Sequence, residues 1–212
     1  MAMELTHVRF ANDLKEKLQV HDESAYYAGA IYPDSRYITG IDRAKTHGAS
    51  SPQDPFASGL SDFEKGWATH LLYDRLGHPY YFALDSYDES DVAQGNHVWQ
   101  FISAAKVVED MLSYKKMGEL AKVMLSITFP VHPNDEDVAG MKRYCAIQKD
   151  LYLQEPGFNE YRNFWLELSD DEGVIHPVMN HTKRLLDDED MRGKIEAIYP
   201  SVLREVREMV NR

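Results

Sequence analysis

The sequence lacks several features that would assign it to a well-known class. Its 212 residues include one cysteine, Cys145, so no disulfide can form within the chain and we expect a reducing compartment. No run of about 18 apolar residues occurs, so we expect no membrane-spanning helix. The first residues lack the basic and apolar regions of a signal peptide, and we therefore expect a cytoplasmic protein.

Basic residues are also scarce. Lysine and arginine number 23 against 35 aspartates and glutamates, which gives a net charge of −12 at pH 7. A surface of this sign repels nucleic acid and anionic membranes at long range, so we expect neither as a partner. A small phosphorylated substrate remains compatible with this charge, because bound metal ions can reverse the local field. The sequence does not indicate an oligomeric state.

Common catalytic signatures are absent too: there is no Gly-rich phosphate loop, no Gly-x-Ser-x-Gly and no paired cysteine motif. Nucleotide kinases, serine hydrolases and zinc fingers therefore receive no support. The apolar residues repeat at spacings of three and four, which is typical of helices, and period-two alternation is almost missing. We predict an all-α fold, a single compact multi-helix domain over residues 1–212 with a metal site between helices.

Proline and glycine divide this helical pattern into segments. Prolines at 33, 130 and 156 and the sequence Gly77-His78-Pro79 are expected to end helices. Residues 33–59, rich in proline and glycine, are expected to form a long functional connection. Cys145 falls within a helical pattern, where we expect it to fill the core. Helices are predicted over residues 5–21, 23–32, 62–76, 92–114, 118–128, 134–153, 158–168, 176–186 and 191–210.

The predicted helix 62–76 carries the most informative pattern. Gly66, His70 and Asp74 share one face with apolar residues, because positions three and four apart are neighbours on a helix. Burial of an ionised carboxylate without a partner costs several kcal/mol. A divalent metal ion bound by His70 and Asp74 would compensate for that cost. The alternative is that Asp74 pairs with an arginine while His70 donates to a backbone carbonyl.

Three further residues extend this pattern. His7 lies on the apolar side of the first predicted helix, Asp34 directly follows Tyr32-Pro33, and His47 lies within the long connection. Each also has a purely structural interpretation. His7 could be a hydrogen-bonded core histidine, Asp34 an ordinary turn residue or cap, and His47 an exposed loop histidine.

Taken in order, the chain presents Thr6-His7, Gly29-x-x-x-Pro33-Asp34, Thr46-His47 and Gly66-x3-His70-x3-Asp74. Over about residues 6–78 it resembles the zinc-dependent phospholipase C and single-strand nuclease superfamily, in particular its intracellular bacterial branch. The resemblance implies an all-helical hydrolase with one or two zinc ions. Asp34, His47, His70 and Asp74 would form the first site, and Asp74 would bridge to a second metal reached by His7. His78 or His97 could add a ligand.

The mechanism implied by the resemblance is metal-assisted hydrolysis of a phosphoester, and we expect a small soluble substrate. The metal would lower the pKa of bound water and stabilise charge on a phosphoryl oxygen. Asp34 and Asp74 are the candidate catalytic residues, and the sequence does not decide whether Asp34 is a ligand or a general base. Arg36 could clamp a phosphate, although a surface salt bridge is the preferred interpretation. Other divalent transition metals would suit the same nitrogen and oxygen ligands.

Two other functions remain open at this point. A His-Asp phosphohydrolase would use the adjacent pair His21-Asp22, but that class needs the pair inside a helix, and Asp22 here resembles a helix N-cap. A non-catalytic helical binding module would use His70 and Asp74 only structurally. Residues 79–212 carry no motif that we recognise, and metal content would separate the binding module from both enzymes.

Overall fold

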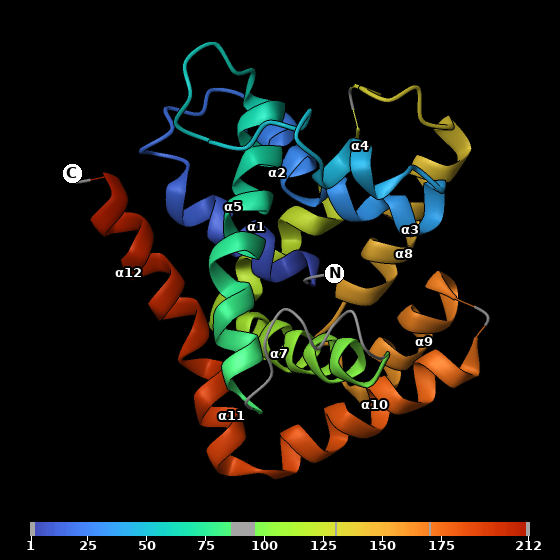
Figure 1. The fold of residues 1–212 in the computed structure, drawn as a ribbon. Coiled ribbons are helices and arrows are strands. Elements are labelled where there is room, and N and C mark those ends of the chain that lie inside the picture. Colours follow the sequence, from blue (N-terminus) through green and yellow to red (C-terminus); the bar gives the residue numbers. More distant parts are fainter. Residues whose placement is uncertain (1–2, 86–95, 130, 170, 211–212) are drawn as a thin grey trace. The chain divides into compact units, whose positions relative to one another are not determined.

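The computed structural model describes residues 3–85, 96–129, 131–169 and 171–210, and within these ranges it is all-α without strands (Figure 1). This confirms the predicted fold class. None of the helices described is long and apolar enough to cross a membrane. The elements are α1 Glu4–Leu14, α2 Glu23–Ile31, the 3-10 helix η1 Tyr32–Ser35, α3 Arg36–Thr39, α4 Arg43–His47, α5 Asp62–Ala83, α7 Asn96–Ser126, α8 Val138–Tyr152, α9 Phe158–Leu168, α10 Glu172–Asp187, α11 Glu189–Glu196 and α12 Ile198–Val210.

The helices belong to two compact units. Unit 2 consists of Glu4–Leu72 and Ser113–Pro156, and unit 1 of Met1–Met3, Tyr73–Leu112 and Gly157–Arg212. Helices α5 and α7 therefore each contribute residues to both units. Unit 2 contains α1 to α4, the first half of α5, the second half of α7, and α8, so most of the predicted site residues lie within it.

In unit 2, α1 and α2 pack side by side (Figure 1). Asp22 caps α2 by accepting a hydrogen bond from the Ala25 amide at 3.0 Å, which satisfies one of the free amides at a helix start. The buried Tyr26 hydroxyl donates to the Ala11 carbonyl at 3.0 Å and so connects α2 to α1. Helix α2 is followed directly by η1, with Pro33 near its start.

Two glycines allow α2 and α5 to cross in backbone contact. A Cβ atom added to Gly29 of α2 would lie 2.0 Å from the Phe63 carbonyl oxygen. One added to Gly66 of α5 would lie 1.9 Å from the Tyr26 carbonyl oxygen. No side chain fits at either distance, so the glycines of the two sequence motifs hold the helices together at their closest approach.

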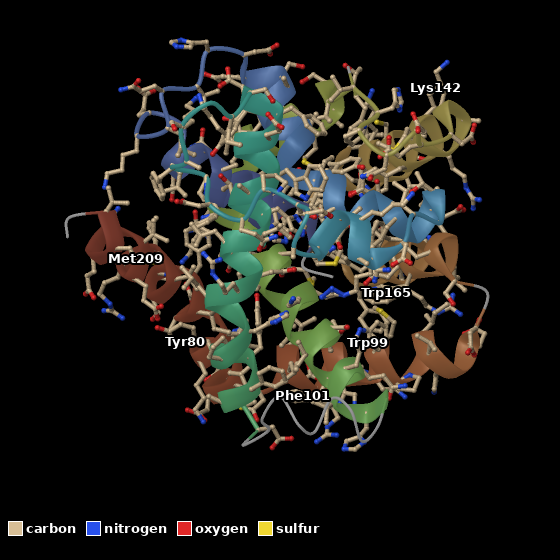
Figure 2. The ribbon with its side chains drawn as sticks, turned by 45° about the horizontal axis from the view of Figure 1, so that its top comes forward. Tyr80, Trp99, Phe101, Lys142, Trp165 and Met209 are labelled. Atoms are coloured by element: carbon tan, nitrogen blue, oxygen red, sulfur yellow. The ribbon has the colours of Figure 1, made fainter. Side chains whose placement is uncertain are left out.

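Unit 1 is built from α9 to α12 and the remaining parts of α5 and α7. Helix α10 packs against α9 and α11, and α11 against α12 (Figure 1). The rings of Trp99 and Trp165, labelled in Figure 2, meet edge to face with centroids 5.8 Å apart. The Tyr161 hydroxyl donates to the buried Asp110 carboxylate at 2.7 Å. The core of this unit therefore combines aromatic packing with charged groups that accept hydrogen bonds from tyrosines.

One predicted helix end and one predicted connection differ from the structure in the first part of the chain. The first helix ends at Leu14 rather than near residue 21, and the chain then turns through Gln19, which has a φ of 50°. Leu18 is still buried, so its apolar character reflects core packing from a turn. The predicted connection 33–59 is also partly helical, since η1, α3 and α4 lie within it.

The predicted stop at Gly77-His78-Pro79 is wrong as well, because α5 continues through Pro79 to Ala83. Proline at this position removes only the hydrogen bond to the carbonyl of residue 75, and Arg75 and Pro79 lie on the exposed face of the helix, where water can hydrate that carbonyl. The buried Tyr81 beyond the proline donates a hydrogen bond to Glu109. This tertiary contact anchors the last turns of α5.

Other boundaries shift for identifiable reasons. The predicted helices 92–114 and 118–128 form one helix, α7. No proline interrupts residues 115–117, and Gly118 costs only about 1 kcal/mol inside a helix. Residues 92–95 lie outside the described ranges. Helix α8 starts at Val138, after Asp137 caps it. Helix α10 starts earlier than predicted, at Glu172, and the last predicted helix is divided into α11 and α12.

Candidate metal site

The site is centred on the Asp34 carboxylate. Asp34 lies in η1, where the turn after α2 directs it inward, and it is only 1% exposed. Among the residues described, neither of its carboxylate oxygens has a hydrogen-bond partner. A buried carboxylate without donors is costly, so this position calls for a positively charged group.

Two histidines face this carboxylate from other elements of unit 2. His47 Nε2 lies 4.0 Å from Asp34 Oδ1, and His70 Nε2 lies 4.0 Å from Oδ2. Both distances are too long for hydrogen bonds. The three side chains offer ligand atoms that all lie within 4.8 Å of one another. Zinc bonds to nitrogen and oxygen are about 2.0–2.2 Å long, so ligand atoms of one ion can lie up to about 4 Å apart.

Hydrogen bonds on the far side of each imidazole determine which nitrogen faces Asp34. His70 Nδ1 donates to the Ala30 carbonyl of α2 at 2.8 Å, so in the neutral ring the lone pair is on Nε2. His47 Nδ1 lies 2.8 Å from Thr46 Oγ1, and this hydroxyl can accept because it donates to the Arg43 carbonyl at 3.4 Å. His70 thus presents an acceptor nitrogen toward Asp34, and His47 does so in the tautomer with its proton on Nδ1. Outer hydrogen bonds of this kind are usual for metal-binding histidines.

The segment carrying His47 is fixed by α5. Trp67 Nε1 donates to the Thr46 carbonyl at 2.7 Å, and the Thr46 side chain is buried. Trp67 lies three residues before His70 on α5, so the same helix supplies one histidine and positions the other. The predicted interpretation of His47 as an exposed loop histidine is wrong, because its side chain is 8% exposed.

His7 completes the group in unit 2. It lies in α1, is fully buried, and its ring stacks on that of His70 with centroids 3.7 Å apart and an interplanar angle of 15°. This contact brings α1 and the first half of α5 together within unit 2. Four of the five predicted metal ligands, His7, Asp34, His47 and His70, therefore lie together in unit 2.

Asp74, the fifth predicted ligand, belongs to unit 1. It follows His70 by one turn of α5 and is 7% exposed. Its Oδ1 lies 3.2 Å from Nζ of the buried Lys106, which is also 3.3 Å from His78 Nε2. The alternative in which Asp74 pairs with a cation is therefore realised, although the cation is a lysine rather than an arginine. His97, the other candidate ligand, is exposed on α7.

Among the described residues Arg36 has no ion-pair partner, so the preferred interpretation of a surface salt bridge finds no support there. Its Nη2 donates to the Tyr37 hydroxyl at 2.9 Å, and its guanidinium lies 4.2 Å from the centre of the Tyr37 ring. Burial and the charge of Asp34 raise the pKa of Tyr37 to about 12, although Arg36 opposes the shift. The Arg36 guanidinium and the neutral Tyr37 phenol thus form a pair with one positive charge, two and three residues after Asp34.

The adjacent pair His21-Asp22 lies outside any helix. His21 is exposed, and Asp22 is the N-cap of α2. Its carboxylate already accepts the Ala25 amide. This placement does not provide the helical pair that a His-Asp phosphohydrolase needs.

Sequence reasoning missed several buried charged groups. Glu4 is buried in α1, and its Oε1 accepts hydrogen bonds from the Tyr144 hydroxyl and Gln148 Nε2 at 2.9 and 2.8 Å. Lys106 and Glu109 are buried in α7. A detectable signal existed in both cases: Glu4 precedes His7 by one helical turn, and the two α7 residues interrupt an apolar run at helical spacing.

Comparisons of this chain with protein-family models, curated proteins and solved structures gave no match.

Proposed function

We propose that the protein is a metal-dependent hydrolase, zinc being the preferred ion, that cleaves a phosphoester of a small soluble molecule. This agrees with the resemblance noted above. The observation that carries the proposal is the Asp34 carboxylate, buried without a hydrogen-bond donor and 4.0 Å from Nε2 of both His47 and His70. Such a group is costly without a cation, and it has the ligand types that zinc binds.

In this proposal Asp34, His47 and His70 hold the ion, so Asp34 acts as a ligand rather than as the general base. When bound, the ion would acidify a water molecule and withdraw charge from a phosphoryl oxygen. Ala30 and Thr46 hold the two imidazoles in the ligating tautomer. The side chains of Asp34 and His70 are 1% exposed or less, so an ion held by them would be shielded from bulk solvent.

The residues around the site have complementary roles. The His7 ring stacks on the His70 ring and supports its position. The nitrogens of His7 could also bind a further ion. Asp74 pairs with Lys106 within unit 1, and its part in metal binding stays a prediction that Asp74→Asn tests. Arg36, bonded to Tyr37, would bind the phosphoryl group, since a guanidinium presents the donor geometry that phosphate accepts.

The first test measures zinc binding by chelator-treated protein in calorimetry. We expect stoichiometric binding to the wild type and a loss of at least about tenfold in affinity in Asp34→Asn and His70→Gln, because each removes a ligand. His97→Gln is the matched control, since His97 is exposed on α7, and it should bind as the wild type does. Absence of binding to the wild type, or equal affinities in all four proteins, would overturn the proposal.

The second test addresses the reaction. Zinc-loaded protein is assayed with a nitrophenyl phosphodiester and a choline phosphoester, and Asp34→Asn and Asp74→Asn are assayed in parallel. We expect hydrolysis that is lost in Asp34→Asn and reduced in Asp74→Asn. Equal rates in the wild type and Asp34→Asn would show that the activity comes from another site. Zinc binding without hydrolysis of any phosphoester in a broad panel would favour the binding module.

A further inference from the structure

A separate pocket in unit 2 has a composition unlike the rest of this acidic chain. It has a volume of about 310 Å³ and lies between one face of α8 and the segment after α7. Its walls are largely apolar and include Ile127, Phe129 and Met141. This volume is at the lower end of the range for small-molecule sites, which are typically apolar with a few polar groups.

The inner wall of the pocket is firmly held. The Phe129 ring packs against Tyr32 and Tyr144, with centroids 6.4 and 6.1 Å away. Tyr144 is fully buried, and its hydroxyl lies 3.0 Å from the Ile31 carbonyl. The wall behind a bound molecule is therefore part of the core, while Val138 at the mouth is 51% exposed.

The polar residues in the lining are Thr128, His132 and two lysines. Lys142 and Lys149 line the pocket from α8, and their spacing of seven residues places them on one face of the helix. Lys142 is exposed (Figure 2). Neither ammonium group forms an ion pair in the described part of the chain. Two lysines without carboxylate partners beside an apolar hollow stand out in a chain of net charge −12.

We propose that this pocket binds an anionic amphiphile, an apolar chain ending in a carboxylate. The hollow would take the chain, and the two lysines would hold the head group at the mouth. A carboxylate is the simplest anion that an apolar chain can carry at its end, and its single charge would pair with the two lysines that line the pocket. The proposal does not depend on the metal site, which uses other residues of unit 2.

Cys145 provides a direct reporter, because it lines the pocket and is the one cysteine of the sequence. The rate of its alkylation by N-ethylmaleimide is measured with increasing decanoate, below the concentration at which decanoate forms micelles. Calorimetry gives the affinity independently. We expect decanoate to bind with saturation and to slow alkylation, and decanol to bind about tenfold more weakly, since it has the chain without the charge.

Variants separate the two contributions to binding. The double variant Lys142→Gln/Lys149→Gln should weaken decanoate binding about tenfold and leave decanol binding unchanged. Lys122→Gln, an exposed lysine of α7 outside the lining, is the charge-matched control and should bind as the wild type. Ala146→Phe, which fills the pocket from an exposed position of α8, should abolish binding of both compounds, whereas Ala146→Ser should not.

The proposal is overturned by equal affinity for decanoate and decanol, by binding that survives Ala146→Phe, or by no binding of decanoate to the wild type in either measurement. Binding to vesicles of phosphatidylglycerol without binding to monomeric decanoate would also overturn it, since the site would then recognise a lipid surface.

Discussion

Asp34 is a residue at which stability and binding have opposite requirements. Its buried carboxylate gains no hydrogen bond from the described part of the protein, and the nearest cationic candidates are imidazoles at 4.0 Å. Without a cation beside it, the ionised carboxylate destabilises the metal-free fold. Because this carboxylate is buried and lacks hydrogen bonds, a cation bound to it stabilises the fold more than a cation bound to an exposed carboxylate.

We therefore expect Asp34→Asn to raise the free energy of unfolding of metal-free protein at pH 8 by about 1 kcal/mol, because the amide removes a buried charge. The same variant should lose the stabilisation by zinc, which for the wild type is about 2.7 kcal/mol at one hundred times the dissociation constant. Urea unfolding with chelator and with zinc measures both effects. Asp150→Asn removes an exposed charge of α8 and should change neither; a metal-free Asp34→Asn less stable than the wild type would contradict the expectation.

The sequence was enough to name the candidate site residues, but several of their contacts could not be predicted. Helical spacing and loop position selected His7, Asp34, His47 and His70, which the structure brings together in unit 2. The same spacing could not show that Lys106, distant in sequence, would pair with Asp74, because a single sequence does not contain pairings between segments. The role of Tyr37 beside Asp34 and Arg36 also depends on the local 3-10 turn, whose geometry the sequence leaves open.

At the scale of elements, the site depends on how closely α2 approaches α5. The hydrogen bond of 2.8 Å from His70 Nδ1 to the Ala30 carbonyl crosses between these helices. It lies one turn from Gly66 and next to Gly29, where each backbone touches the other helix. Metal affinity and helix packing should therefore change together when either glycine is replaced.

Gly66→Ala tests this coupling. A Cβ atom at 1.9 Å from the Tyr26 carbonyl oxygen forces the helices apart, and overpacking of this kind typically costs about 1–3 kcal/mol. We expect a lower melting temperature and weaker zinc binding, because the His70 ring loses its support. Gly193→Ala in α11 is the control: nothing lies within 4 Å of its added Cβ, so it should be neutral or stabilising. Similar effects of the two substitutions would argue against close packing as the cause.

Helix existence was easier to predict than helix ends, for physical reasons visible in α5 and α7. Apolar periodicity predicts the buried face of each helix, but it does not show whether Pro79 ends α5. The helix continues past this proline because Tyr81 is anchored by a hydrogen bond to Glu109, which belongs to another segment. Caps were more informative. Asp22 and Asp137 cap α2 and α8 through hydrogen bonds from amides three residues further on. This interaction is local, and the Asp22 cap was predicted, whereas α8 was predicted to start at residue 134.

Across the whole molecule, the acidic surface and the buried charges act on different properties. A net charge of −12 opposes approach to polyanions, which is the reason to propose a small soluble substrate. Inside unit 1, Glu109 is fully buried and accepts hydrogen bonds from Tyr73, at 2.7 Å, and from Tyr81. Burial raises its pKa to about 7, although both tyrosines and Lys106 oppose the shift.

This shift makes global stability depend on pH. The folded protein holds the Glu109 proton up to about pH 7, whereas the unfolded chain releases it near 4.5. In that window the folded state binds more protons, so the free energy of unfolding falls as pH rises, by about 3 kcal/mol from this group, and levels off above about pH 8. Glu109→Gln keeps a neutral acceptor for the tyrosines and should remove this part of the slope.

The measurement is urea unfolding of the wild type and Glu109→Gln between pH 5 and 8.5, with the difference between the two curves plotted against pH. Subtraction cancels the histidines and other groups that titrate in the same range and leaves the Glu109 contribution. Glu208→Gln replaces an exposed glutamate of α12, and its curve should run parallel to that of the wild type. A Glu109→Gln curve that is also parallel would mean that the folded and unfolded states release this proton at the same pH, contrary to the effect expected of its burial.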